Sequence, residues 1–196
     1  MKSNTIYNIE TFYTTNKYDC IPSDFTKDHL DCFSLIRSNI PVMPSTYKRR
    51  IYLKKDGRAL HEYGNSETGE IRKILNEDIL ISELVKLDFV IVTLGDKLIK
   101  EKYELLKDAE YLITQIGANC MNLIFSNAPK NIFLLSNDVI FGEYWYSQLC
   151  SALNNEAIIN TKLFYNKSHI YNADPTNQWN NPFYVNIPDI LSHIKD

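Results

Sequence analysis

The sequence has no apolar stretch long enough to lie across a membrane. Spanning a bilayer takes roughly 20 consecutive apolar residues, and no run in this chain approaches that length. The N-terminus carries one lysine, Lys2, and then stays polar, so it lacks the apolar core of a secretion signal. We therefore expect a cytoplasmic protein that stays in the compartment where it is made.

Patterns that bind metals or form disulfides are also missing. The four cysteines, Cys20, Cys32, Cys120 and Cys150, are scattered without a CxxC pair, and the four histidines neither cluster nor stand at ligand spacing with them. Cys120 and Cys150 lie in apolar stretches, where buried reduced thiols are the usual state. We expect no metal site and no cofactor.

Glycine is scarce, and no phosphate-binding glycine motif is present. The chain has six glycines, and none of them forms a GxGxxG or a Walker loop. Lysine and arginine total 21 against 24 acidic residues, a net charge of −3, which leaves no basic field for nucleic acid. No Ser-His-Asp set or carboxylate pair can be placed from spacing alone. These absences argue against dinucleotide, P-loop and nucleic-acid functions.

What the sequence does contain is an alternation of short apolar runs and helical patterns. With 44% hydrophobic and 12% aromatic residues, it can form a well-packed core. Alternation with short connections is typical of βαβ units, so we predict an α/β fold, a Rossmann-like parallel sheet with helices on both faces. The predicted strands cover residues 50–54, 89–93, 111–114, 131–135 and 157–159. The predicted helices start at Asn76, cover 98–107, 119–126 and 144–153, and close the chain from Ile187.

The domain organisation is simple. Residues 1–45 are expected to form a lead-in segment with one short helix that ends near Ser38. Residues 46–196 form the domain itself. The run at 89–93 is continuously apolar, which is expected for a strand covered on both faces.

The best candidate for a binding site is the turn at residues 114–119, between a buried strand and a helix. Ligands of open parallel sheets sit at the carboxyl ends of strands, where helix N-termini point free N–H groups outward. Gly117 permits close approach of the backbone, and the amides of Ala118, Asn119 and Cys120 could hold a phosphate. A glycine that only lets strand and helix pack closely explains the same residues.

A second candidate is a basic group around the first strand, which consists of Lys48, Arg49 and Arg50 together with Lys54, Lys55 and Arg58. Side chains alternate along a strand, so not all of them could contact one ligand. Lys54, Lys55 and Arg58 follow the carboxyl end of that strand, the side from which a diphosphate would be bound. Taken alone, these three residues are more simply explained as charged side chains on a solvated surface.

A third group is better explained by structure than by binding. Arg72 precedes Asn76 and Glu77. Glu77 could be a polar contact for a ligand, but Asn76 as a helix cap and Glu77 as a partner of the helix dipole explain both residues without a binding role. The aromatic residues 144–146 could stack on a base, although a core position is more usual.

Three blocks of the sequence, at residues 50–55, 72–77 and 105–125, have a recognisable order and spacing. Through these blocks, residues 49–153 resemble the C-terminal domain of glycosyltransferase family 61, often described as capsular polysaccharide biosynthesis or xylosyltransferase-type proteins. Pro129 also falls where the family has a proline. The third block, which contains Gly117 and Ala118, is the most specific.

The resemblance implies a metal-independent, inverting glycosyltransferase of GT-B architecture. Residues 46–196 would then be its nucleotide-sugar-binding domain, commonly for a UDP-sugar, and the acceptor would be a cell-surface or capsular glycan. Lys55 would replace an arginine of the family that faces the phosphates, and Asn122 would steady the turn. No catalytic residue is identified. The residues expected to bind substrate are Lys55, Arg58, Arg72, Gly117, Ala118, Asn119 and Asn122.

Three positions depart from the family pattern. Ile116 stands where the family has histidine, Leu135 where it has glutamate, and Lys102 where it has glutamine. The histidine and glutamate belong to the donor site, so a catalytically inactive remnant or interaction module is the alternative to an active enzyme.

The lead-in segment also bears on the acceptor. We expect residues 1–45 to be the remnant of, or linker to, an absent N-terminal domain, with the acceptor site supplied by a separate chain or by that missing domain. Peripheral membrane association is possible for a protein that resembles this family, but no feature of the sequence encodes it.

Overall fold

The structure is a computed structural model. It describes residues 31, 34–36, 38–40, 50–55, 73–126, 131–136, 160–165 and 182–194. In this part of the chain, no helix combines the length and the apolar character that crossing a bilayer requires.

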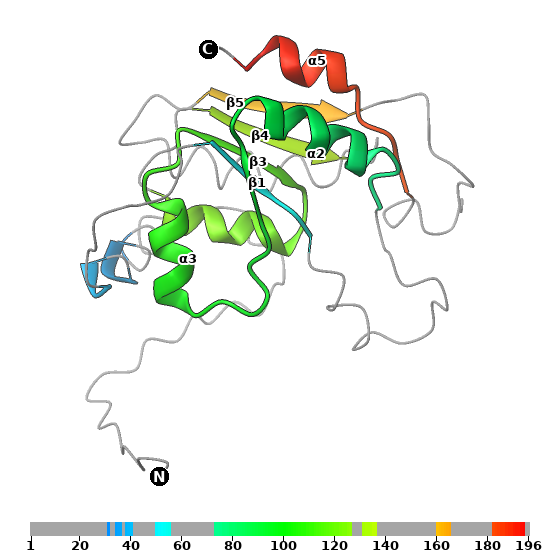
Figure 1. Ribbon diagram of the computed structural model, residues 1–196. Helices are drawn as coiled ribbons and strands as arrows, with labels where there is room; N and C mark the ends of the chain where they lie inside the picture. The colour runs from blue at the N-terminus through cyan, green and yellow to red at the C-terminus, as the bar shows by residue number, and fades with distance from the viewer. Residues whose placement is uncertain are drawn as a thin grey trace, which may run out of the picture.

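One five-stranded parallel sheet organises the domain (Figure 1). The strand order is β2-β1-β3-β4-β5, and every neighbouring pair is parallel. This confirms the predicted α/β, Rossmann-like fold. The strands are β1 (Arg50–Leu53), β2 (Val90–Val92), β3 (Tyr111–Gln115), β4 (Asn131–Ser136) and β5 (Asn160–Tyr165). The helices are α2 (Glu77–Lys86), α3 (Ile99–Leu106), the 3-10 helix η2 (Ala118–Phe125) and α5 (Ile187–Ser192).

The helices cover both faces of the sheet. Figure 1 shows α2 and α5 on one face and α3 on the other, and the buried residues divide in the same way. The chain therefore leaves β1 toward the α2 face and leaves β3 toward the face of α3 and η2. The edge of the sheet where the neighbouring strands β1 and β3 end is the topological switch point of a doubly wound fold.

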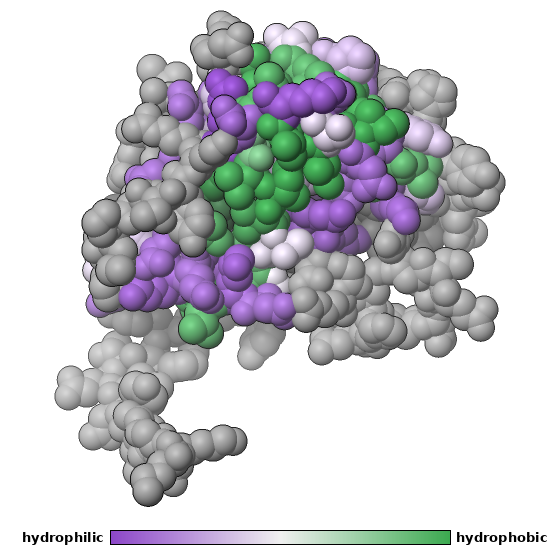
Figure 2. Space-filling view, in the orientation of Figure 1, coloured by the Kyte–Doolittle hydropathy of each residue, from purple (hydrophilic) through white to green (hydrophobic). Residues whose placement is uncertain are grey.

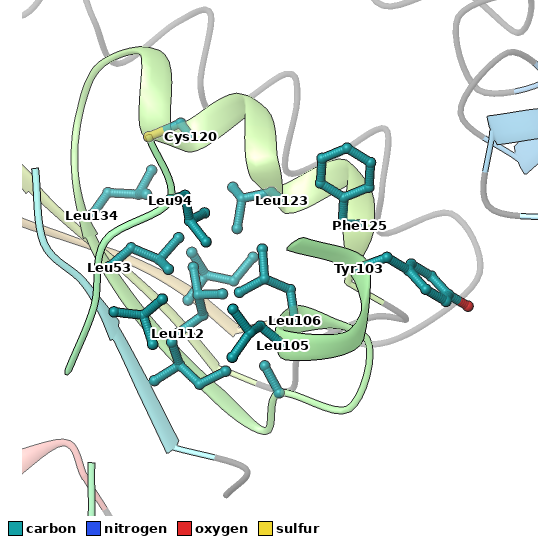
Figure 3. Packing of buried hydrophobic residues seen from close by; sticks show 14 of the residues in the cluster. Leu53, Leu94, Tyr103, Leu105, Leu106, Leu112, Cys120, Leu123, Phe125 and Leu134 are labelled. Carbon is teal, nitrogen blue, oxygen red and sulfur yellow. The ribbon is translucent and has the colours of Figure 1, made fainter. Parts of the chain in front are cut away.

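Side-chain alternation along the strands builds a separate core on each face. Figure 3 shows Leu53, Leu106, Leu112 and Leu123 packed together between the sheet and the helices α3 and η2. On the other face, the buried cluster joins residues of α2 and α5 to the alternate strand positions. It includes Tyr52, Leu80, Leu84, Ile113, Phe133, Phe183 and Ile190. Because strand side chains alternate between faces, Tyr52 lies between Ile51 and Leu53 yet belongs to the opposite core.

The strand predicted at 89–93 forms β2 at the edge of the sheet, where β1 is its one partner among the described strands. Its residues pack on both faces, as expected: Val92 and the partly buried Val90 join the core on the α3 side, and Phe89 and the partly buried Ile91 join the core on the α2 side. Figure 2 shows a hydrophobic area below α2, on the β1 side of the sheet, bordered by hydrophilic side chains. The continuous apolar run therefore marks a strand that packs on both faces, even at the edge of the described sheet.

The segment predicted as a helix at 119–126 forms a 3-10 helix instead of an α-helix. Its least exposed residues recur every third position: Cys120, Leu123 and the C-cap Ser126 are at most 2% exposed, and Phe125 is buried beside them at 7%. A period of three is that of the 3-10 helix, in which residues i and i+3 share a side. Packing of this side against α3 and the sheet explains why the tighter helix forms here.

The remaining predictions near the C-terminus are only partly covered. The helix expected at 144–153 and the strand expected at 157–159 lie outside the described residues, and β5 begins at Asn160. The closing helix begins at Ile187 as predicted.

Asn76 has the N-cap position of α2 as expected, but its side chain makes no capping bond. Its Nδ2 donates to the carbonyl of Val185 at 2.8 Å, and its Oδ1 accepts from the amide of Val185 at 3.0 Å. The side-chain amide of Asn76 thus bonds both backbone groups of Val185, as another backbone amide would. These two bonds join the start of α2 to the segment that leads into α5.

We therefore predict that Asn76→Asp lowers the free energy of unfolding by about 1–3 kcal/mol, because a carboxylate oxygen would face the Val185 carbonyl without a proton between them. Urea denaturation measures this change. Asn186→Asp is the matched control, because the side chain of Asn186 only accepts a bond, from the Asp189 amide at 3.3 Å, and an aspartate can do the same. Equal losses in both variants would contradict the role given to Asn76.

Candidate functional site at the switch point

The carboxyl ends of β1 and β3 lie side by side and bring two of the predicted site segments together. Leu53 pairs with Thr114, and continuing this register by one residue sets Lys54 beside Gln115. Lys54 and Lys55 follow β1, and the turn around Gly117 follows β3. Two segments that are about sixty residues apart in the sequence therefore meet at one edge of the sheet, as parallel pairing requires.

Gly117 has a backbone conformation that other residues avoid. Its φ is 153° and its ψ is −162°, a region that only glycine enters without strain. This conformation turns the chain from β3 into η2. The turn itself therefore requires Gly117, whether or not the backbone there also lies close to a ligand.

The turn leaves two amides available for a ligand. Ala118 and Asn119 are the first two residues of η2, and they precede the first amide that can bond within a 3-10 helix. That first bonded amide belongs to Cys120, whose N–H donates to the Gly117 carbonyl at 2.9 Å. The expectation that Cys120 helps to hold a phosphate is therefore wrong, because its amide is already used.

The side chain of Asn119 ties η2 to the end of β1. Its Nδ2 donates to the Lys54 carbonyl at 3.3 Å, and the side-chain amide of Asn122 donates to the Asn119 carbonyl at 3.1 Å. Both asparagine side chains thus hold the local backbone. Asn119 can face a ligand with its main-chain N–H while its side chain holds the two strand ends in place.

Three polar residues meet where β1 approaches the first turn of α2. The hydroxyl of Tyr52 donates to Oε1 of Glu77 at 2.6 Å, and Nζ of Lys54 lies 3.5 Å from Oε2 of the same carboxylate. Burial, together with the charge of Glu77 and the hydrogen bond to it, raises the pKa of Tyr52 far above its usual range. Tyr52 is therefore a neutral hydrogen-bond donor.

Sequence reasoning considered Glu77 as a ligand contact, favoured its role at the helix dipole, and missed this contact with Tyr52 and Lys54. The available signal was strand alternation, which puts Tyr52 and Lys54 on the same face, toward α2. What the sequence could not supply was the position of α2 on that face.

The other predicted basic residues do not all belong to this edge. Arg50 begins β1 at the opposite end, where its Nη1 donates to the Leu87 carbonyl at 3.1 Å and its guanidinium lies 5.3 Å from the centre of the Tyr111 ring. These contacts support the C-terminus of α2. Lys55 is half-buried beside Lys54. Arg58, Arg72 and the aromatic residues 144–146 lie outside the described residues.

No group of three or more metal-ligating side chains occurs among the residues that the structure describes.

Comparison with known proteins assigns the family. The model of the family described as glycosyltransferase 61 matches residues 6–133, more than half of the chain. The chain belongs to the glycosyltransferase 61 family. A comparison with curated proteins gives no match. The family match includes both sides of the switch point and ends within β4, and family membership gives the chain a glycosyltransferase-like function.

Two positions at which this glycosyltransferase 61 chain departs from the expected family residues lie in the core. Ile116 is 5% exposed and belongs to the cluster under η2, whereas Leu135 is fully buried in the cluster on the α2 face. The Ile116 amide donates to the Leu135 carbonyl at 2.8 Å. Both side chains are thus accommodated by packing, and neither brings a polar group to the switch point.

We predict that Gly117→Ala costs about 1–3 kcal/mol of folding stability, because alanine must adopt a conformation that only glycine tolerates. The free energy of unfolding measures this. Gly95→Ala is the control, since Gly95 lies in an exposed turn and Gly117 is the glycine with positive φ within the described ranges. Alanine at Gly95 is expected to leave stability unchanged or raise it by up to about 1 kcal/mol. A neutral Gly117→Ala would show that the turn does not need glycine.

The buried Tyr52 hydroxyl predicts a loss of stability in alkali. In the unfolded chain a tyrosine ionises near pH 10, whereas the raised pKa keeps Tyr52 protonated in the native state. Its stabilising contribution is complete below about pH 10 and falls by about 1.4 kcal/mol per pH unit above that.

Urea denaturation between pH 8 and pH 11 checks this prediction. Tyr52→Phe is expected to lose stability less steeply than the parent protein above pH 10, whereas Tyr184→Phe, which alters an exposed tyrosine, is expected to follow the parent slope. Parallel curves for all three proteins would rule the prediction out.

Proposed function

We propose that this glycosyltransferase 61 chain binds a nucleotide-sugar, a UDP-sugar, at the switch point and transfers the sugar to a glycan acceptor. The observation that carries the proposal is the juxtaposition of Lys54 and Lys55 with the first amides of η2, joined by the bond from Asn119 to the Lys54 carbonyl. A diphosphate is the part of the donor that suits cations and helix N-terminal amides together.

The proposed chemistry is a displacement at the anomeric carbon. An acceptor hydroxyl forms a new bond to that carbon on the side opposite to the diphosphate, while the bond from the carbon to the diphosphate oxygen breaks, so the configuration inverts. The acceptor proton leaves with a base, and the electron pair of the broken bond remains on the diphosphate. The amides of Ala118 and Asn119 and the ammonium of Lys55 stabilise this growing charge without a metal.

The alternative proposal is a protein that binds a donor without turnover. The buried, apolar side chains of Ile116 and Leu135 favour it, because the residues expected there, histidine and glutamate, are the ones able to move protons or orient hydroxyl groups. Both proposals share the diphosphate site and differ only in the chemical step.

Calorimetric titration with UDP tests the shared site. We expect Lys55→Ala to weaken UDP binding about tenfold, the loss of one charged contact to phosphate. Lys86→Ala is the control, because Lys86 lies at the far end of α2, where it pairs with Glu83 at 2.6 Å. This exposed pair contributes little to stability, and its loss is expected to leave UDP binding unchanged. Absence of UDP binding by the parent protein at millimolar concentration would defeat the donor site.

Turnover separates the two proposals. Release of UDP from a UDP-sugar by the purified chain, reduced by Lys55→Ala and not by Lys86→Ala, would support the enzyme. UDP binding with no release from any of several UDP-sugars and glycan acceptors would support the inactive alternative.

A further inference from the structure

Lys54 is a cation that the fold fixes from three sides at the switch point. Its backbone N–H donates to the carbonyl of Val92 in β2 at 2.8 Å, and its carbonyl accepts from the side chain of Asn119 in η2 at 3.3 Å. Its ammonium lies 3.5 Å from the Glu77 carboxylate at the start of α2. Three different elements therefore determine where this lysine lies and where its side chain points.

The carboxylate that holds Lys54 is itself held. Oε1 of Glu77 accepts the Tyr52 hydroxyl at 2.6 Å, so the second oxygen is the one that faces Lys54. Tyr52 is fully buried, whereas the side chains of Glu77 and Lys54 are 21% and 38% exposed. The three residues thus run from the core to the surface, and the ammonium is at the most exposed end of the series.

We propose that Glu77 is a positioning residue for the donor: anchored by Tyr52, it holds the Lys54 ammonium where it contacts the donor diphosphate from the α2 side of the switch point. This inference rests on the proposed function. It gives the ammonium of Lys54 a defined place on the α2 side of the site and gives Glu77 a role beyond the helix dipole.

The charge balance supports positioning rather than direct contact by the carboxylate. An ammonium has three donor hydrogens, so Lys54 can bond Glu77 with one and still offer the others to phosphate oxygens. A lysine side chain loses considerable rotamer entropy when it is fixed. Because the ion pair with Glu77 already restrains the Lys54 side chain in the free protein, part of this entropy is lost before the ligand binds. The carboxylate of Glu77 would itself repel a diphosphate. Glu77 can therefore favour binding only through the position that it gives to Lys54.

A double-mutant cycle tests this dependence, with UDP and inorganic pyrophosphate as the probes and calorimetry as the measurement. We expect Lys54→Ala to weaken both probes about tenfold and Glu77→Gln to weaken them about threefold to fivefold, as partial loss of one charged contact. In the Lys54→Ala background, Glu77→Gln is expected to have no effect or to strengthen binding slightly, because only repulsion is then removed. Glu83→Gln, which breaks the exposed pair with Lys86 on the same helix, is the matched control and should change neither probe.

Each other result overturns the inference. Equal weakening by Glu77→Gln with and without Lys54 would mean that Glu77 acts independently of the lysine. Tighter binding by Glu77→Gln in the parent background would mean that repulsion outweighs positioning. Unchanged binding by Lys54→Ala would remove the cation from the site. Urea denaturation of each variant identifies any that lose affinity by unfolding, and for these the cycle is repeated with Tyr52→Phe, whose expected effect is smaller and likewise disappears without Lys54.

The experiment also separates this inference from the proposed function. If the parent protein binds pyrophosphate and UDP but Lys54 does not contribute, the inference fails and the donor site remains. If the parent protein binds neither probe, the donor site fails and the inference falls with it.

Discussion

The site at the end of the sheet depends on the double pairing of one short strand. β1 has only four residues, and it pairs with β2 on one side and with β3 on the other. Because the chain leaves β1 and β3 toward opposite faces, the residues that follow these strands are left at the switch point between two helix starts. The cores on both faces hold this strand in register, since a shift by one residue would exchange Tyr52 with its apolar neighbours.

The polar contacts at the switch point extend this pairing beyond the last residue of the strand. The Lys54 amide donates to Val92 of β2, and the Lys54 carbonyl accepts from the Asn119 side chain of η2. These bonds fix the backbone one residue beyond the end of β1. Main-chain bonds of this kind leave side chains free for other tasks. This is why the same lysine can complete the fold with its backbone and present a charge with its side chain.

Most of the fold was predictable from the sequence, because short branched apolar runs and amphipathic segments mark βαβ units directly. The turn at Gly117 was also identified from its place between a buried strand and a helix. The type of η2 was not, because a 3-10 helix depends on how its buried side packs. The use of the side chains of Asn76, Asn119 and Glu77 could not be predicted either, since each bonds to a residue that is distant in sequence and that only the tertiary structure brings near.

The departures from the family pattern have a consistent physical meaning. At the two positions where the family resemblance leads us to expect histidine and glutamate, Ile116 and Leu135 join the cores on opposite faces. This exchange puts apolar side chains in place of polar ones, and burying a side chain of this size stabilises a domain by about 1.5–3 kcal/mol. The same exchange removes groups that could carry protons. The proposed diphosphate site is made of backbone amides and lysines and does not need those groups. Under either proposed function, binding of a diphosphate would therefore depend on other residues than the transfer step.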